Sequence, residues 1–315
     1  MTWLLWRQNR SRLATGAVLL AMFALAVVPT GVHMANVYDE AVLTCARNPT
    51  CAYAGNLFQG YGAIVDLVHL TILVPVVFGA LGATLISREA ENATNGLVWT
   101  QTVTRRRWLI ATVAAMVVAA VLTSAVVSAL VTWWSGTPNS IHGDRFQGAQ
   151  FDTQNLVPVA AALFAVALGI AVGSLLRRTV PAIFVTVGAY VAVRMLVAVY
   201  LRPSYVGAAT RSVPLGVDPS LPSGSWTLRQ YITGSEGRVG NRGISIPTEC
   251  APSNPVGRGG PAVDRCLGKL GFRRVVEFQP ASRYWHFQLV EASLLTALAA
   301  LLITVAVVHT LRRDA

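Results

Sequence analysis

Four ionisable side chains interrupt long apolar stretches of the sequence. They are Asp66, His69, Arg194 and Glu291. Charged groups in such surroundings are rare and usually paired, because hydrocarbon does not solvate them. The sequence leaves two partners open for Arg194, namely Asp66 and Glu291. The set fits a substrate or proton path, but we favour a structural salt bridge between helices near the outer interface. Asp66 and His69 share one face of a helix, but two residues do not make a metal site.

The sequence holds no recognisable catalytic or nucleotide-binding motif. A phosphate-binding loop needs a lysine followed by Ser or Thr, whereas the only lysine, Lys269, precedes Leu270. No G-x-S-x-G, H-E-x-x-H or paired-carboxylate pattern occurs in an apolar stretch. We therefore expect no catalytic, cofactor-binding or metal-binding residue in this chain, which is not expected to be an enzyme. The energy for any driven process must come from another subunit.

The four cysteines all lie outside the apolar stretches, as Cys45 and Cys51 and as Cys250 and Cys266. Cysteines confined to the oxidising side of a membrane favour two disulfides. Local pairing within each group is the simplest of the three possible connectivities. Four free or metal-binding thiols are the alternative, but no C-x-x-C or Cys/His spacing supports a metal.

Six nearly uncharged stretches of 20 or more residues divide the chain. They are residues 13–32, 62–86, 108–134, 156–176, 180–201 and 287–311. Each can cross roughly 30 Å of hydrocarbon as a helix that rises ~1.5 Å per residue. With 54% hydrophobic and only 12% charged residues, the chain has the composition of a membrane protein. We expect an all-α membrane protein with six transmembrane helices.

Arginines indicate the orientation of these helices. Eleven arginines flank the spans on one side if the spans alternate, whereas the two short loops on the other side hold only Arg47 and Arg145. The positive-inside rule then places both termini in the cytoplasm, with an uncleaved first span. The net charge of +11 therefore mostly reflects the arginines that set the orientation of the spans in the membrane. We expect no nucleic-acid partner.

These assignments divide the chain into three parts. Residues 1–201 hold an N-terminal interfacial segment and five spans, residues 202–286 form one large extracellular loop, and residues 287–315 hold the sixth span and a basic cytoplasmic tail. The extracellular segment is rich in Gly, Pro and Ser, so a disulfide and docking onto the spans or a partner are needed to order it. The short link after residue 176 predicts an antiparallel hairpin, in which Gly169 and Gly173 serve helix packing.

The cytoplasmic loop 87–107 is longer than topology alone requires. It begins with acidic residues, carries a tryptophan outside the spans and ends in three arginines. Glu89, Glu91, Trp99 and Arg105 are the candidates for contact with a cytosolic partner. A docking element is our interpretation, and an interfacial helix that lies on lipid is the alternative.

Several segments resemble the ABC exporter permeases of the second type found in actinobacteria. The first is MTWLLWRQ at residues 1–8, the second is the loop 88–108, and the third is YLRP at residues 200–203. The most specific is QPASRYWHFQ at residues 279–288, directly before the last span.

This resemblance implies six spans per subunit, two permease copies per transporter and separate cytosolic ABC ATPase subunits that carry ATP and Mg. In this family the loop between the second and third spans is the coupling element. We therefore expect a multi-pass protein of the plasma membrane, in contact with lipid, that serves as the permease subunit of an ATP-driven exporter and moves an amphiphilic substrate outward. The alternative is a membrane-anchored sensor or scaffold that binds an extracellular partner through residues 202–286.

Overall fold

The computed structural model describes residues 2–47, 59–91, 105–137, 139, 145–146, 148–234, 237–238, 247–250 and 261–313. Within these residues, six helical segments are long and apolar enough to cross a membrane. They are Ala14–Leu43, Gly62–Arg88, Leu109–Trp134, Val157–Leu176, Thr179–Ser204 and Ala281–Thr310. The six spans expected from the sequence are therefore confirmed.

The first helix, α1 (Thr2–Arg47), is much longer than the expected span. No glycine or proline follows Gly31 until Pro49, so nothing in the sequence ends the helix at residue 32. Its 46 residues extend about 69 Å at ~1.5 Å per residue, which is more than twice the thickness of hydrocarbon. The expected interfacial segment is thus continuous with α1.

The second span is interrupted, whereas the third and the sixth are not. It consists of α2 (Gly62–Leu70), the 3₁₀ turn η3 (Thr71–Leu73) and α3 (Val74–Glu91). The break falls next to Pro75, which has no backbone N–H to donate to the preceding turn. The third span lies within α5 (Arg105–Trp134), and the sixth lies within α11 (Tyr284–Arg313).

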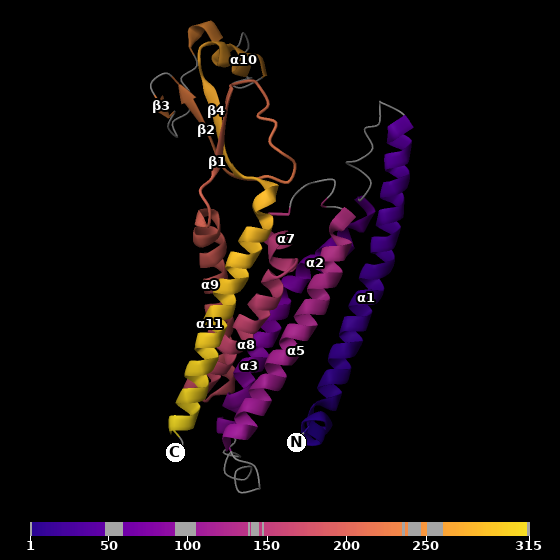
Figure 1. Cartoon of the computed structure of the whole chain (residues 1–315), viewed down its shortest axis with the longest axis vertical. Helices are drawn as coiled ribbons and strands as arrows, with labels where there is room; N and C mark the ends of the chain where they lie inside the picture. Colours follow the sequence, from indigo (N-terminus) through magenta and orange to yellow (C-terminus); the bar gives the residue numbers. More distant parts are fainter. Residues whose placement is uncertain are drawn as a thin grey trace.

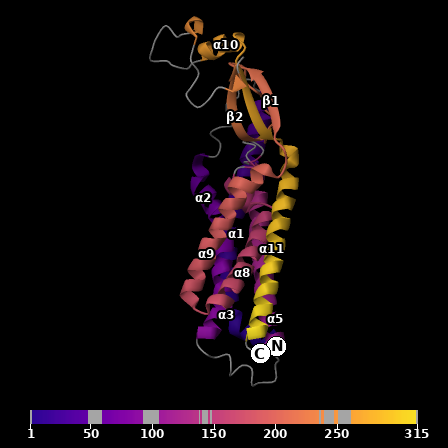
Figure 2. The same ribbon diagram turned by 90° about the vertical axis from the view of Figure 1, so that its left-hand side faces the viewer.

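The fourth span, α8 (Val157–Leu176), lies at the centre of the bundle. Helices α3, α5, α9 (Thr179–Leu196) and α11 all pack against it, as Figures 1 and 2 show. It is the most buried of the six spans and is apolar on every side, as expected for a helix that neighbours surround. The long α1 lies at the periphery of the bundle, where Gly31 meets the ring of Trp133 on α5.

Glycines bring α3 and α8 into backbone contact. A Cβ atom added to Gly169 would lie 2.2 Å from the carbonyl oxygen of Gly79, and one added to Gly173 would lie 2.5 Å from that of Ala83. Gly82 meets the backbone of Val166 in the same way, at 2.7 Å. Larger residues cannot occupy these positions without moving the two helices apart. The predicted packing role of Gly169 and Gly173 is confirmed.

The predicted hairpin between the fourth and fifth spans is also confirmed. Arg177 ends α8 in the left-handed region at φ 51°, and Arg178 is extended before α9 begins. Beyond Leu196, α9 continues as the π-helical turn η4 (Val197–Leu201) and the 3₁₀ turn η5 (Arg202–Ser204).

The chain is not all-α, because residues 209–279 contain a four-stranded antiparallel sheet of order β1-β4-β2-β3. Its strands are β1 (Ala209–Pro214), β2 (Trp226–Gly234), β3 (Gly237–Arg238) and β4 (Arg273–Gln279). The expectation of an all-α protein is wrong here. The strands are short and separated by loops rich in Gly and Pro, so they produce no long apolar run, although β4 reads RRVVEFQ and has β-branched and aromatic residues.

The sheet lies beyond one end of the bundle, and both termini lie at the opposite end (Figure 1). Strand β4 leads through Pro280 and the 3₁₀ turn η7 (Ala281–Arg283) directly into α11. The short helix α10 (Pro261–Lys269) buries Val263 and Leu267 against Leu215, next to the 3₁₀ turn η6 (Thr248–Cys250).

Replacement of Gly169 by Ala should destabilise the bundle, because the new methyl group would lie inside the contact radius of the Gly79 carbonyl oxygen. We expect a loss of about 1–3 kcal/mol in thermal or denaturant unfolding in detergent, which is typical of overpacking. Gly188→Ala on α9 is the matched control, since a Cβ there meets nothing within 4 Å. Equal stability of the two variants would refute the close contact of α3 and α8.

Candidate functional site

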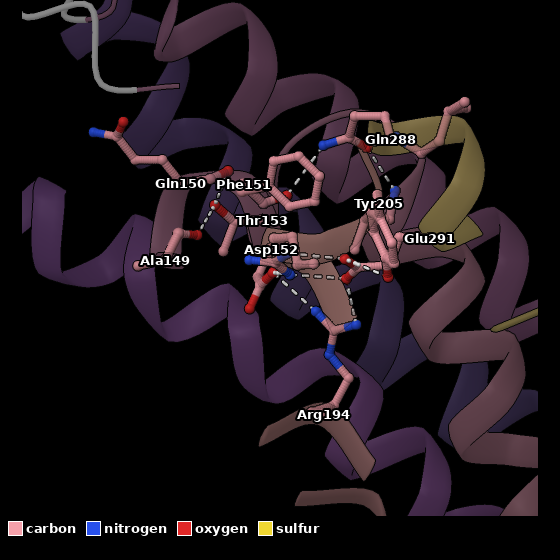
Figure 3. A network of polar contacts seen from close by, with 12 residues as sticks. Ala149, Gln150, Phe151, Asp152, Thr153, Arg194, Tyr205, Gln288 and Glu291 are labelled. Carbon is pink, nitrogen blue, oxygen red and sulfur yellow. Dashed lines mark hydrogen bonds and ion pairs between the residues drawn. The ribbon is translucent and has the colours of Figure 1, made fainter. Parts of the chain in front are cut away.

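A cluster of four charged side chains lies inside the sheet end of the bundle (Figure 3). Asp152 comes from the short helix α7 (Gly148–Thr153), Arg194 from α9, Arg202 from η5 and Glu291 from α11. Glu291 is 0% exposed and Arg202 is 2% exposed. The side chains of Arg194 and Asp152 are 11% and 14% exposed. Two acids and two arginines make the cluster electrically neutral.

Each arginine contacts both acids. Arg194 lies 2.8 Å from Asp152 Oδ1 through Nη2 and 2.7 Å from Glu291 Oε1 through Nη1. Arg202 also pairs with Asp152, and it donates from Nη2 to Glu291 Oε1 at 2.8 Å and from Nε to Glu291 Oε2 at 2.9 Å. Charges removed from water are costly unless each is paired and hydrogen-bonded, and this arrangement meets both conditions.

Two aromatic residues complete the surroundings of the cluster. The guanidinium carbon of Arg202 lies 4.2 Å from the centre of the Phe151 ring, close enough for a cation–π contact. Burial and the nearby Glu291 carboxylate raise the pKa of Tyr205 to about 12, so its hydroxyl group stays protonated. That hydroxyl donates to Glu291 Oε2 over 3.5 Å.

The structure decides between the two partners that the sequence leaves open for Arg194. Arg194 pairs with Glu291, whereas Asp66 is exposed on α2 and takes part in none of the ion pairs among the described residues. His69 is half-buried one turn further along α2. Asp66 and His69 therefore do not belong to the cluster.

Sequence reasoning missed Asp152 and Arg202, because each lies just outside an expected span. Arg202 follows the expected boundary at residue 201, and Asp152 precedes the one at residue 156. Charges in those positions are normally solvated. Arg202 could have been predicted from its place in the YLRP segment, which is one of the segments that resemble the ABC permeases of the second type.

The QPASRYWHFQ segment forms the junction between the sheet and the bundle. Gln279, which is 0% exposed, donates to the Val206 carbonyl at 2.7 Å, and Arg283 donates both to the Gly207 carbonyl and to Gln279 Oε1 at 2.7 Å. These bonds fix the course of the chain between η5 and β1 against the start of α11.

Gln288 extends this junction to the central helix. Its Oε1 accepts the backbone N–H groups of Leu156 and Val157 at 3.2 and 3.0 Å, and its Nε2 donates to the Phe151 carbonyl. The first N–H groups of a helix have no partner within the helix, so a side chain from α11 caps α8. Phe146, Phe151 and Phe287 pack beside it in one aromatic group.

At the opposite end of the bundle, Glu91 holds the start of α9. Its Oε2 accepts the Thr179 hydroxyl at 2.6 Å and the Thr179 backbone N–H at 3.1 Å. These two hydrogen bonds, aided by the charge of Arg178, lower the pKa of the exposed Glu91 carboxyl from its ordinary value. Ser87, one turn earlier on α3, donates to Thr179 Oγ1 over 3.5 Å.

The remaining candidates from the sequence fall partly outside the described residues. Trp99 lies outside them, and the side chains of Glu89 and Arg105 are not described either. Cys250 and Cys266 form a disulfide with their Cα atoms 5.6 Å apart. The other expected pair lies outside the described residues, because Cys51 is not among them. Among the described residues no three His, Cys, Asp or Glu side chains are grouped as metal ligands.

These residues hold helices against one another at both ends of the bundle. The neutral cluster joins α7, α9 and α11 at the sheet end, and the Glu91–Thr179 contact joins α3 to α9 at the other. Both sets of contacts bind helices to one another.

Comparison with protein-family models matches residues 17–202 to the family described as ABC-2 membrane transporter related. The match covers more than half of the 315 residues and extends from the first span to Arg202. Neither the curated proteins nor the solved structures contain a match. The resemblance to ABC permeases of the second type is thereby confirmed.

Removal of Arg194 alone should destabilise the protein more than removal of Arg194 together with Glu291. Arg194→Gln leaves two acids facing one arginine, whereas the double Gln variant leaves Asp152 and Arg202 as a neutral pair. Breaking a buried pair from one side commonly costs about 3–5 kcal/mol, and the double variant should recover part of that loss in denaturant unfolding.

Asp66→Asn serves as the control for this cycle, since Asp66 is exposed. Its effect should stay within roughly 0.5 kcal/mol. Strict additivity of the Arg194 and Glu291 substitutions would show that the two side chains do not share a contact.

Proposed function

The chain belongs to the ABC-2 membrane transporter related family, and on that premise we propose that it is the membrane subunit of an exporter that moves an amphiphilic substrate outward. As a member of this family with six apolar helices, it is a multi-pass membrane permease of an ABC transporter. The observation that carries the proposal is the family match across the first five spans, in a sequence without a nucleotide-binding motif of its own.

The proposed orientation puts the termini in the cytoplasm and the sheet outside the cell, with the protein in the plasma membrane. This orientation is supported by a difference between the residues found at the two ends of the bundle. The sheet end carries the Cys250–Cys266 disulfide, which suits an oxidising compartment. The opposite end carries both termini and the exposed Arg177 and Arg178 of the hairpin, which suit the positive-inside rule.

In this orientation the loop between α3 and α5 faces the cytosol, where the ATPase subunits that bind ATP and Mg would meet it. Trp99 and its apolar neighbours are the proposed anchor, and Glu89 and Arg105 are the proposed charged contacts. A second copy of the permease would complete the transporter. Many large apolar side chains on the outer faces of the bundle are exposed, which suits contact with lipid and with that copy.

The second candidate is a sensor or scaffold that binds an extracellular partner. The sheet favours it, because strands β1 to β4 carry exposed basic side chains such as Arg211, Arg229 and Arg273, and the Cys250–Cys266 disulfide lies at the same end. The two candidates differ in one respect that can be measured, since only a permease requires an ABC ATPase.

Trp99→Ala should reduce the amount of ATPase that co-purifies with the full chain by at least roughly tenfold, or ~1.4 kcal/mol, because buried aromatic anchors dominate interfaces. Trp285→Ala is the matched control, since Trp285 is 54% exposed at the sheet end of the bundle. If the Trp99 variant retains the ATPase, the loop between α3 and α5 only connects the two helices and does not anchor the ATPase. Absence of any ATPase from the wild-type protein would favour the sensor.

A further inference from the structure

The first turn of α9 is held by α3 rather than by the hairpin that precedes it. Thr179 follows a two-residue link in which Arg177 is left-handed and Arg178 is extended. Thr179 is the first residue of α9, so its N–H has no partner within the helix. Glu91 supplies the missing partner by accepting both the N–H and the hydroxyl of Thr179.

Helix α3 is in turn locked to the centre of the bundle. Gly82 of α3 meets the backbone of α8, and Cβ atoms added to Gly169 and Gly173 of α8 would clash with the backbone of α3. Ser87, which is 0% exposed, lies one turn before Glu91 and also reaches Thr179. The last turn of α3, from which the loop 92–104 departs, is thus in direct contact with the first residue of α9, and α3 meets α8 about two turns earlier, at Ala83.

The same continuous segment reaches the charge cluster at its other end. From Thr179 to Arg202 the chain advances 23 residues through α9, η4 and η5, or roughly 35 Å at ~1.5 Å per residue. Arg194 and Arg202, both on this segment, hold Asp152 and Glu291. One helical segment therefore bears a contact with α3 at one end and the neutral cluster beneath the sheet at the other.

We propose that Thr179 is a positioning residue for energy coupling, through which Glu91 makes α9 follow any displacement of the end of α3 and so moves the charge cluster. The inference rests on the proposed function, because the displacement is supplied by the ATPase. It assigns Glu91 to a contact within the chain instead of a contact with the ATPase. Helices in firm contact transmit such displacements as rigid bodies.

The test uses the full chain purified with its ATPase and spin-labelled unnatural amino acids at Tyr200 and Trp133. Both positions are exposed, at 73% and 50%. Tyr200 lies in η4, which continues α9, and Trp133 lies in the last turn of α5. Electron paramagnetic resonance then measures the distance between the labels with and without ATP and Mg. In the wild type, ATP should shift this distance.

Thr179→Val removes the hydroxyl group and keeps the size of the side chain. The fraction of molecules that adopt the ATP-induced label distance should fall between roughly two- and tenfold, which is the range that one hydrogen bond supports. The amount of bound ATPase should stay the same. Thr179→Ser should restore the shift. Thr84→Val is the matched control, because the Thr84 hydroxyl donates only to the Leu81 carbonyl of its own helix.

A second variant, Glu91→Ala, keeps the test decisive should Thr179→Val fail to fold. If the two residues act through one contact, the double variant loses no more of the shift than Glu91→Ala alone, which also removes the acceptor of the Thr179 N–H. Additive losses, loss of bound ATPase in Thr179→Val, or an unchanged shift in that variant would each overturn the inference and leave the permease proposal intact. Absence of the ATPase from the wild-type protein would overturn both.

Discussion

The sheet end of this protein depends on one buried carboxylate that two guanidinium groups share. Glu291 has no exposed surface, and Arg194 from α9 and Arg202 from η5 both reach it. Without water to solvate them, none of these charges is stable away from its partners. The positions of α7, α9 and α11 are therefore set together. Because β4 continues into α11, the sheet takes its position from the same contact.

The rest of the bundle is organised around α8. Glycines allow α3 to approach it at backbone distance, and Gln288 from α11 caps its first turn. The two ends of the molecule then differ in kind. One end buries its charges in a neutral cluster beneath the sheet, and the other carries both termini and the exposed Arg177 and Arg178.

Hydropathy and charge placement predicted the six spans and the hairpin, because burial in a membrane leaves a strong compositional signal. They missed the sheet, since its short strands carry no long apolar run and are ordered by the start of α11 and a disulfide. They found Arg194 and Glu291 inside spans but missed Asp152 and Arg202, which lie in the short helix α7 and the 3₁₀ turn η5, just outside the expected spans. Only the tertiary fold shows that those segments are buried.

The central claim, that this chain couples a cytosolic ATPase to the membrane, is tested most directly by an electron cryomicroscopy structure of the full chain purified from its own membrane with the ABC ATPase it retains. We expect an ATPase seated at the end that carries both termini, on the loop between α3 and α5, with the sheet on the far side of the membrane. Density for the ATPase at the sheet end, or a chain that retains no ATPase, would contradict it.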